Sequence, residues 1–109
     1  MAFFTPIQPE GWDRAKGYSN GMLAPAGGRI LFIAGQIGWD AQQRLVGDDF
    51  VAQFEQALRN VTAVLQAAGG TPEHLGRLTL YVTDKTRYAT HAAEVGEVYR
   101  RVIGRHFPA

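Results

Sequence analysis

Two residues in the first third of the chain could offer a hydrogen-bond donor to a small ligand. Tyr18 follows Gly17 and precedes Gly21, a setting in which a tyrosine hydroxyl reaches solvent at a sheet edge while its ring packs. Gly35 lies in an apolar run, where its backbone amide stays accessible because no side chain blocks it. Each also has a plain structural interpretation, Tyr18 as a core or rim aromatic and Gly35 as a strand irregularity. Neither residue is specific by itself.

Metal and nucleophilic chemistry have weaker support. The three histidines, His74, His91 and His106, are far apart, and His91 could share a helix face only with Glu94. A zinc site needs three or four ligands, so a solvated helix face is the favoured interpretation. Ser19, the only serine, lies in a strand-like segment and not on the strained turn between a strand and a helix that a nucleophilic serine needs. The chain has no cysteine, which excludes disulfides and thiolate chemistry. We therefore predict no metal and no cofactor.

Composition predicts one soluble domain over residues 1–109. Hydrophobic residues make up 46% and charged residues 19% of the chain, and the net charge is +1. A protein that holds nucleic acid by electrostatics usually carries a basic stripe, so we expect no nucleic-acid partner. No apolar run is long enough to span a membrane, and the first residues lack the pattern of a signal peptide. We expect a cytoplasmic protein without a membrane partner.

Periodicity predicts two long helices. The first is capped by Asp48 or Asp49 and ends at Gly69-Gly70. Its apolar stripe contains Phe50, Phe54, Ala57, Leu58, Val61, Leu65 and Ala68. The second runs from about Thr86 to Ile103 as one helix, and its inner stripe contains Tyr88, Ala92, Val95, Tyr99 and Val102. Between them, Thr71 and Pro72 predict a short helical turn over 71–74.

Three segments have the composition of strands. Residues 18–24 and 29–35 predict a hairpin around a turn at 25–28, and residues 77–83 alternate as a strand with one buried face. Residues 1–17 are interpreted as an irregular lead-in. The glycines at 35 and 38 predict a bulge, or a backbone that another group approaches closely. Together these elements predict an α+β fold with one sheet covered on one face by two helices. Two helices of this length need a wider sheet to cover than the predicted strands can form.

Several short motifs, in their order and spacing, resemble the RidA/YjgF family, also called L-PSP. They cover nearly the whole chain, and only their combination is specific. The matching segments are Gly17-Tyr18-Ser19-Asn20, Phe32 to Ile37 with Ala34-Gly35-Gln36, Gln53, Ala57 to Val61, Ala67-Ala68-Gly69, Tyr81 to Asp84, and Phe107-Pro108-Ala109.

The resemblance implies a chorismate-mutase-like fold with a mixed sheet, a homotrimer, and clefts between subunits. In deaminating members of the family these clefts hydrolyse 2-imino and enamine acids to 2-keto acids and ammonia. By position, Tyr18 and the Gly35 amide would be site residues for a small carboxylate ligand. Thr86 and Tyr88 would line the same cleft.

The sequence also departs from the deaminating pattern. Ala34 stands where the family usually has a serine, and Thr86 where many deaminating members have an asparagine. The carboxylate-binding arginine and a later glutamate would lie beyond Ala109, so no catalytic residue is assigned. Because the predicted sheet is narrow, we expect a further C-terminal segment with the missing strands; without it, no imine hydrolysis is expected.

Three functions follow as hypotheses. The first is an enamine/imine deaminase, and the second is a non-catalytic relative that keeps the cleft for binding or sensing a small acid. The third is RNA cleavage, an activity attached to the family's older name. The small net charge and the lack of a paired acid–base histidine arrangement disfavour this third hypothesis.

Overall fold

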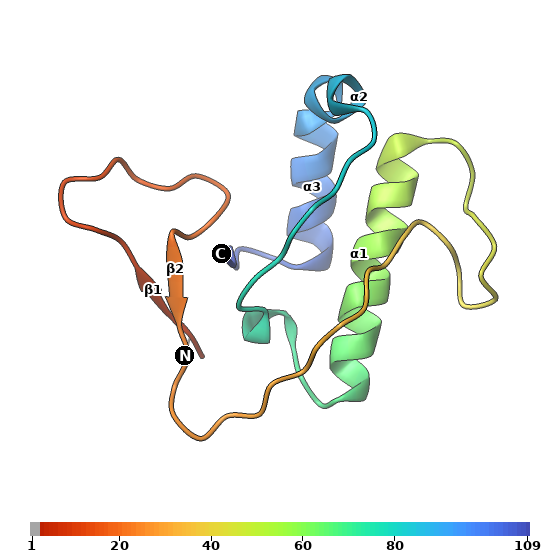
Figure 1. Cartoon of the computed structure of the whole chain (residues 1–109). Helices are drawn as coiled ribbons and strands as arrows, with labels where there is room; N and C mark the ends of the chain where they lie inside the picture. Colours follow the sequence, from red (N-terminus) through yellow and green to blue (C-terminus); the bar gives the residue numbers. More distant parts are fainter. Residues whose placement is uncertain (1–2) are drawn as a thin grey trace.

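Helices form the hydrophobic core of this chain, and a short β-hairpin lies beside them (Figure 1). The structure is a computed structural model that describes residues 3–109. The α+β class predicted from the sequence is confirmed. In chain order the elements are β1 (Thr5–Ile7), β2 (Gly21–Leu23), α1 (Phe50–Ala67), the 3-10 turn η1 (Pro72–His74), α2 (Lys85–Thr90) and α3 (Ala92–Val102).

Helix α1 forms where the sequence predicts it. The Asp49 carboxylate accepts a hydrogen bond from the Ala52 amide at 2.8 Å, so Asp49 is the cap. Such a bond satisfies one of the amides that the first helical turn leaves without a partner. After the helix, Gly69 has a φ of +85°, a conformation that favours glycine. Local signals therefore determine both ends of α1.

The second predicted helix is divided into two. The predicted single helix over 86–103 is corrected to α2 and α3, which meet at His91, where φ is −103° and ψ is 19°. The Nδ1 atom of His91 lies 2.8 Å from the Arg87 carbonyl oxygen, the same oxygen that accepts the His91 amide at 3.1 Å. The side chain and the backbone amide of His91 thus share one acceptor where the two helices meet.

The core lies between α1 and α3, with the chain after η1 closing one end. Its buried members are Phe54, Leu58, Leu65, Leu75, Val95, Val98 and Ile103. Several predicted stripe residues pack around this core while partly exposed, namely Phe50, Val61, Tyr88, Tyr99 and Val102. The helical periodicity of the sequence therefore identified the faces that pack together. None of the helices in residues 3–109 combines the length and apolar character needed to cross a membrane.

The sheet differs from the prediction. Within residues 3–109 it contains two antiparallel strands, β1 and β2, with Thr5 opposite Leu23 and Ile7 opposite Gly21. The partner of the 18–24 segment is therefore part of the predicted irregular lead-in, and not the 29–35 segment. The predicted turn at 25–28 is present, with Gly27 at a φ of +83°. It leads away from the hairpin, so it does not join two paired strands.

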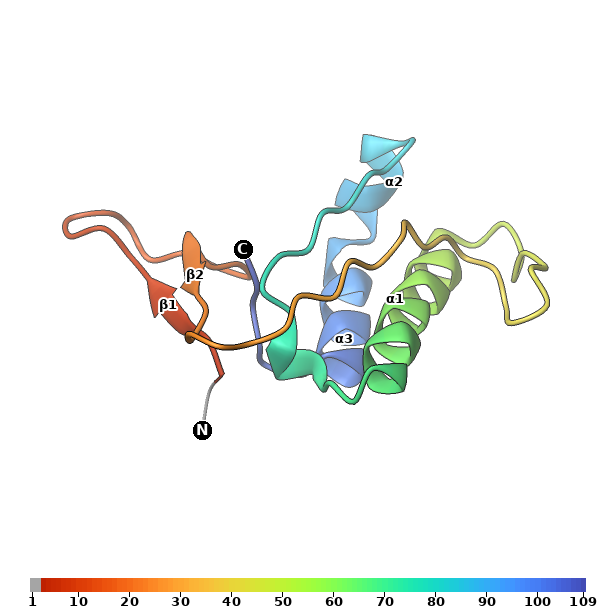
Figure 2. The same cartoon turned by 60° about the horizontal axis from the view of Figure 1, so that its bottom comes forward.

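The segments 29–37 and 77–83 cross in front of the helices and do not join the sheet of β1 and β2 (Figures 1 and 2). Ile33 and Leu78 pack against the core, but Phe32 is 90% and Tyr81 93% exposed. A mixed sheet covered by two helices is thus not formed among the described residues. The physical reason is that strand composition specifies no partner, and a ladder needs a neighbouring backbone about 4.8 Å away.

The last residues connect the hairpin with the helices. Ser19 donates from its amide to the Pro108 oxygen at 3.2 Å and from its hydroxyl to the Phe107 oxygen. On the other side, the Ala109 amide donates to Gly76 at 3.0 Å, and the Leu78 amide donates to Ala109 at 2.9 Å. Ala109 thus bonds to the residues on either side of Arg77, which is the hydrogen-bond pattern of two parallel strands. The segment 107–109 thereby fixes the loop that contains Tyr18 relative to the helical core.

Tyr99 makes the stability of this region sensitive to high pH. Its hydroxyl donates to the His106 oxygen, its ring stacks on Phe107 at 5.8 Å, and burial raises the pKa of Tyr99 to about 12. Since the folded pKa lies above the unfolded value of about 10, this contribution is complete below pH 10 and is lost as pH rises toward 12.

We expect Tyr99→Phe to lower the free energy of unfolding by about 0.5–1.5 kcal/mol at pH 8, the usual contribution of one hydrogen bond. The difference from wild type should shrink between pH 10 and 12, as measured by urea unfolding at several pH values. Tyr81→Phe, which removes a hydroxyl from a ring 93% exposed, is the control at pH 8. A Tyr99→Phe deficit that stays constant up to pH 12 would contradict this prediction.

Candidate functional site

Tyr18 lies beside a surface cavity formed by the hairpin and its connecting loop. The cavity has a volume of about 430 Å³. Tyr18 is 53% and Trp12 63% exposed, so both rings present large surfaces to solvent. The residues that line the cavity are Pro6, Ile7, Gln8, Trp12, Arg14, Ala15, Tyr18, Ser19 and Asn20. The Tyr18 side chain is thus exposed to solvent at this cavity.

Hydrogen bonds hold this loop in shape. The side-chain amide of Gln8 donates to the carbonyl oxygens of Trp12, at 3.2 Å, and Asp13, at 2.9 Å. Asn20 in turn donates to the Gln8 side chain at 2.6 Å. Both ends of the loop are therefore connected through one glutamine, which limits the conformations of the residues between them.

Gly35 is exposed, and it lies in a different part of the chain from Tyr18. A Cβ atom built there would meet nothing within 4 Å. The segment after it is fixed by Asn60 on α1, which donates to the oxygens of Ile37, at 3.2 Å, and Trp39, at 2.8 Å. The open amide of Gly35 therefore sits next to a segment that is attached to the core.

The close approach predicted for a glycine in this run occurs at Gly38. A Cβ atom there would lie 2.7 Å from the Cα of Gln53 in α1, and Gly38 is buried. The two glycines thus have different roles, Gly38 in packing and Gly35 in leaving backbone exposed.

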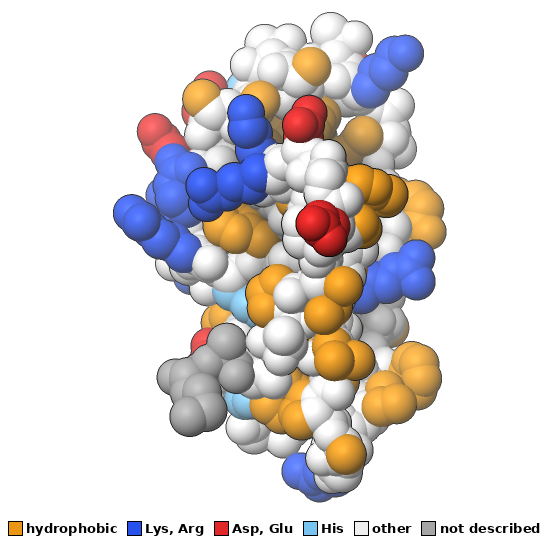
Figure 3. Space-filling view, turned by 90° about the vertical axis from the view of Figure 1, so that its left-hand side faces the viewer, with side chains coloured by type: hydrophobic (Ala, Val, Ile, Leu, Met, Phe, Trp, Pro, Cys, Tyr) orange, Lys and Arg blue, Asp and Glu red, His pale blue; other side chains and the backbone are white. Residues whose placement is uncertain are grey.

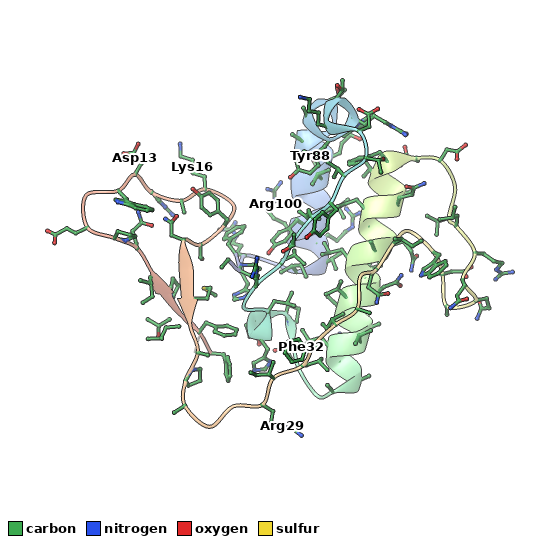
Figure 4. The ribbon with its side chains drawn as sticks, viewed as in Figure 1. Asp13, Lys16, Arg29, Phe32, Tyr88 and Arg100 are labelled. Carbon is green, nitrogen blue, oxygen red and sulfur yellow. The ribbon has the colours of Figure 1, made fainter. Side chains whose placement is uncertain are left out.

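Thr86 and Tyr88 belong to α2, on the helical side of the molecule (Figure 4). The Thr86 amide donates to the Asp84 cap at 3.0 Å, and its side chain is exposed. Tyr88 is half-buried and packs edge-to-face on Phe50 at 6.2 Å. Neither residue, nor Gly35, lines the cavity beside Tyr18. Within one chain the four predicted residues therefore do not share a cavity.

The histidines serve local structure in the part of the chain that is described. His74 accepts the Thr71 amide at 2.9 Å, confirming the short turn, and His106 lies 2.7 Å from the Leu75 oxygen. No set of three or more histidine, aspartate and glutamate side chains among residues 3–109 could hold a metal ion. No two histidines are hydrogen-bonded as an acid–base pair within this range.

The strongest ionic contacts also have a structural role. Two hydrogen bonds hold the pKa of Glu55 below its ordinary value, the larger effect coming from Arg59 and the smaller from Arg101. Glu55 lies 2.7 Å from a guanidinium nitrogen of each arginine, which joins α1 to α3. These groups are partly exposed, so each pair contributes at most about 1 kcal/mol.

Comparison with known proteins decides the family. Residues 12–109 match the family model described as Endoribonuclease L-PSP. The chain belongs to this family, also called RidA/YjgF. The resemblance predicted from the sequence motifs is thereby confirmed.

Individual RidA/YjgF relatives include proteins with a named reaction. The chain is 38% identical over 91 residues to protein DfrA of Myxococcus xanthus, covering 83% of this chain and 63% of that protein. It is 31% identical over 93 residues to the 2-iminobutanoate/2-iminopropanoate deaminase of Homo sapiens, covering 84% of this chain and 63% of that protein. The chain thus spans less than two thirds of the length of these relatives.

A solved RidA/YjgF structure has the same overall arrangement. It is a protein of unknown function of the Rid family, YyfB of Yersinia pestis, with a TM-score of 0.74 and 30% sequence identity. The match covers 98% of this chain and 80% of that one. The arrangement of helices and hairpin described above is therefore that of a folded family member.

Sequence reasoning missed two members of the Tyr18 cavity, Trp12 and Arg14. A signal was present, since Arg14 and Lys16 are the cations close to Tyr18 in sequence. Strand and helix patterns do not reveal which of two loop cations faces a cavity. That information comes from the conformation of the loop.

Proposed function

We propose that this RidA/YjgF protein binds small 2-imino and 2-keto carboxylic acids through the exposed Tyr18 and Gly35. The observation that carries the proposal is the exposed Tyr18 side chain at a cavity large enough for a molecule of a few carbons. The named reaction of the human relative, hydrolysis of 2-iminobutanoate and 2-iminopropanoate, supports this class of ligand.

The proposed site lies between subunits of a homotrimer. In one chain Tyr18 lies in the loop between β1 and β2, while Thr86 and Tyr88 lie on α2. The hairpin and α2 lie apart in Figure 1. A second copy that places its α2 and its Gly35 beside the Tyr18 cavity would bring these groups to one ligand. Sedimentation at micromolar concentration tests this assembly, and a monomer would contradict it.

Binding without turnover is favoured over catalysis. Ala34 has no hydroxyl to offer, and its carbonyl is occupied by the Gln36 side-chain amide at 3.0 Å. Thr86 uses its backbone at the Asp84 cap. Imine hydrolysis also needs a group that activates water, and the exposed Tyr18 hydroxyl is a weak base for that task. Hydrolysis of imines is the second candidate, favoured by the name of the human relative.

Calorimetric titration with 2-oxobutanoate and pyruvate tests the proposal. Saturable binding is expected, with neutral 2-oxobutanamide as the control that lacks the carboxylate. Ammonia release from freshly generated 2-aminoacrylate, measured in parallel, separates the candidates: a rate above the buffer value would favour the deaminase. No binding of either acid together with no ammonia release would overturn both.

A further inference from the structure

The cavity beside Tyr18 has a single charged group. Among its lining residues only Arg14 carries a charge, and no carboxylate contributes to the lining. The neighbouring charges of the loop, Asp13 and Lys16, are labelled in Figure 4 and point outward, away from the hairpin strands. A cavity with one cation and no anion attracts a negatively charged ligand.

The guanidinium of Arg14 is available to such a ligand. Arg14 is exposed, and none of the ion pairs between described residues involves it. A guanidinium presents a planar set of N–H donors that matches a carboxylate with two parallel hydrogen bonds. Binding a carboxylate would therefore cost no existing ion pair.

The surrounding loop is arranged to keep Arg14 near Tyr18. Gln8 bonds to the carbonyl oxygens of Trp12 and Asp13, immediately before Arg14. Ser19, immediately after Tyr18, is bonded to the C-terminal segment. Both residues are thus flanked by fixed backbone, which reduces the ordering cost of binding.

We propose that Arg14 binds the carboxylate of the small acid, with the Tyr18 hydroxyl donating to its 2-keto or 2-imino group. This assignment rests on the proposed function. Trp12 and Ile7 supply apolar surface for a short side chain, since both line the cavity and are exposed. Hydrophobic side chains also reach the surface on this side of the molecule (Figure 3). The ligand class is therefore a short monocarboxylic acid.

Titration of Arg14→Gln with 2-oxobutanoate tests this assignment, with Lys16→Gln as the matched control. The two changes remove the same charge from the same loop, so long-range electrostatics cannot distinguish them. We expect Arg14→Gln to raise Kd about 10- to 100-fold, as loss of a charged hydrogen bond does. Lys16→Gln should change Kd less than about twofold, and Arg14→Lys should be intermediate because the ammonium lacks the planar fork.

The outcomes separate this assignment from the function on which it rests. Equal Kd values for Arg14→Gln and wild type would overturn the role of Arg14 while leaving the proposed function intact. Butanoate binding that depends on Arg14, without any binding of 2-keto acids, would support the carboxylate site and overturn the proposed ligand class. An equal increase in Kd for Arg14→Gln and Lys16→Gln would show that only the overall charge of the loop matters for binding, and would overturn the assignment. Thermal unfolding of each variant confirms that it is folded.

Discussion

Replacing Leu58 by alanine is expected to lower the free energy of unfolding by about 2–5 kcal/mol, the usual cost of emptying a buried leucine site. Leu58 is 3% exposed and lies on the face of α1 that packs against α3. Val98, also 3% exposed, belongs to the same cluster from α3. Because small domains are stable by only about 5–15 kcal/mol, this one change should remove a large share of the total.

Urea unfolding followed by circular dichroism measures this loss. Val64→Ala on the same helix is the control, since Val64 is 37% exposed and surface changes usually alter stability by less than about 0.5 kcal/mol. Equal effects of Leu58→Ala and Val64→Ala would contradict the packing of α1 on α3 described above.

Replacing Gly38 by alanine is the second change with a large expected effect. The added methyl would lie 2.7 Å from both Cα and Cβ of Gln53, so backbone of α1 or of the segment must move. Both sides are restrained, because Gly38 accepts from the Val46 amide at 2.9 Å and the Gln53 side chain donates to Gly47 at 2.6 Å. We expect a loss of about 1–3 kcal/mol, typical of overpacking.

Gly35→Ala is the matched control for this substitution. Nothing lies within 4 Å of the Cβ position at Gly35, and its φ is outside the left-handed region. Thermal unfolding should therefore show a lower Tm for Gly38→Ala and nearly the wild-type value for Gly35→Ala. A Gly38→Ala protein as stable as the Gly35→Ala protein would show that the segment 36–39 does not rest on α1.

The amino-acid sequence by itself determined helix α1 and both of its ends. The spacing of Phe54, Leu58 and Leu65, the Asp49 cap and the glycines after Ala68 are signals between residues a few positions apart. A helix satisfies its backbone through bonds between near neighbours in sequence, so such signals suffice. The family followed from the same kind of information, namely short motifs at fixed spacing.

Strand pairing was beyond the reach of the sequence. The segments 29–35 and 77–83 have strand composition, yet the ladder joins residues 5–7 to 21–23. A β-strand bonds to a partner that is distant in sequence, and composition does not name that partner. The division of the second helix at His91, where φ is −103° and ψ is 19°, likewise had no signal in the apolar spacing of residues 86–103.

The residues of the candidate site were likewise predictable only in part from the sequence. Tyr18 and Gly35 were identified from residue type and neighbouring glycines, and both are accessible in the structure. Only the tertiary structure decided that Arg14 lines the Tyr18 cavity while Lys16 points outward. The physical reason is that side-chain direction in a loop depends on contacts such as those of Gln8 with Trp12 and Asp13, which no local pattern encodes.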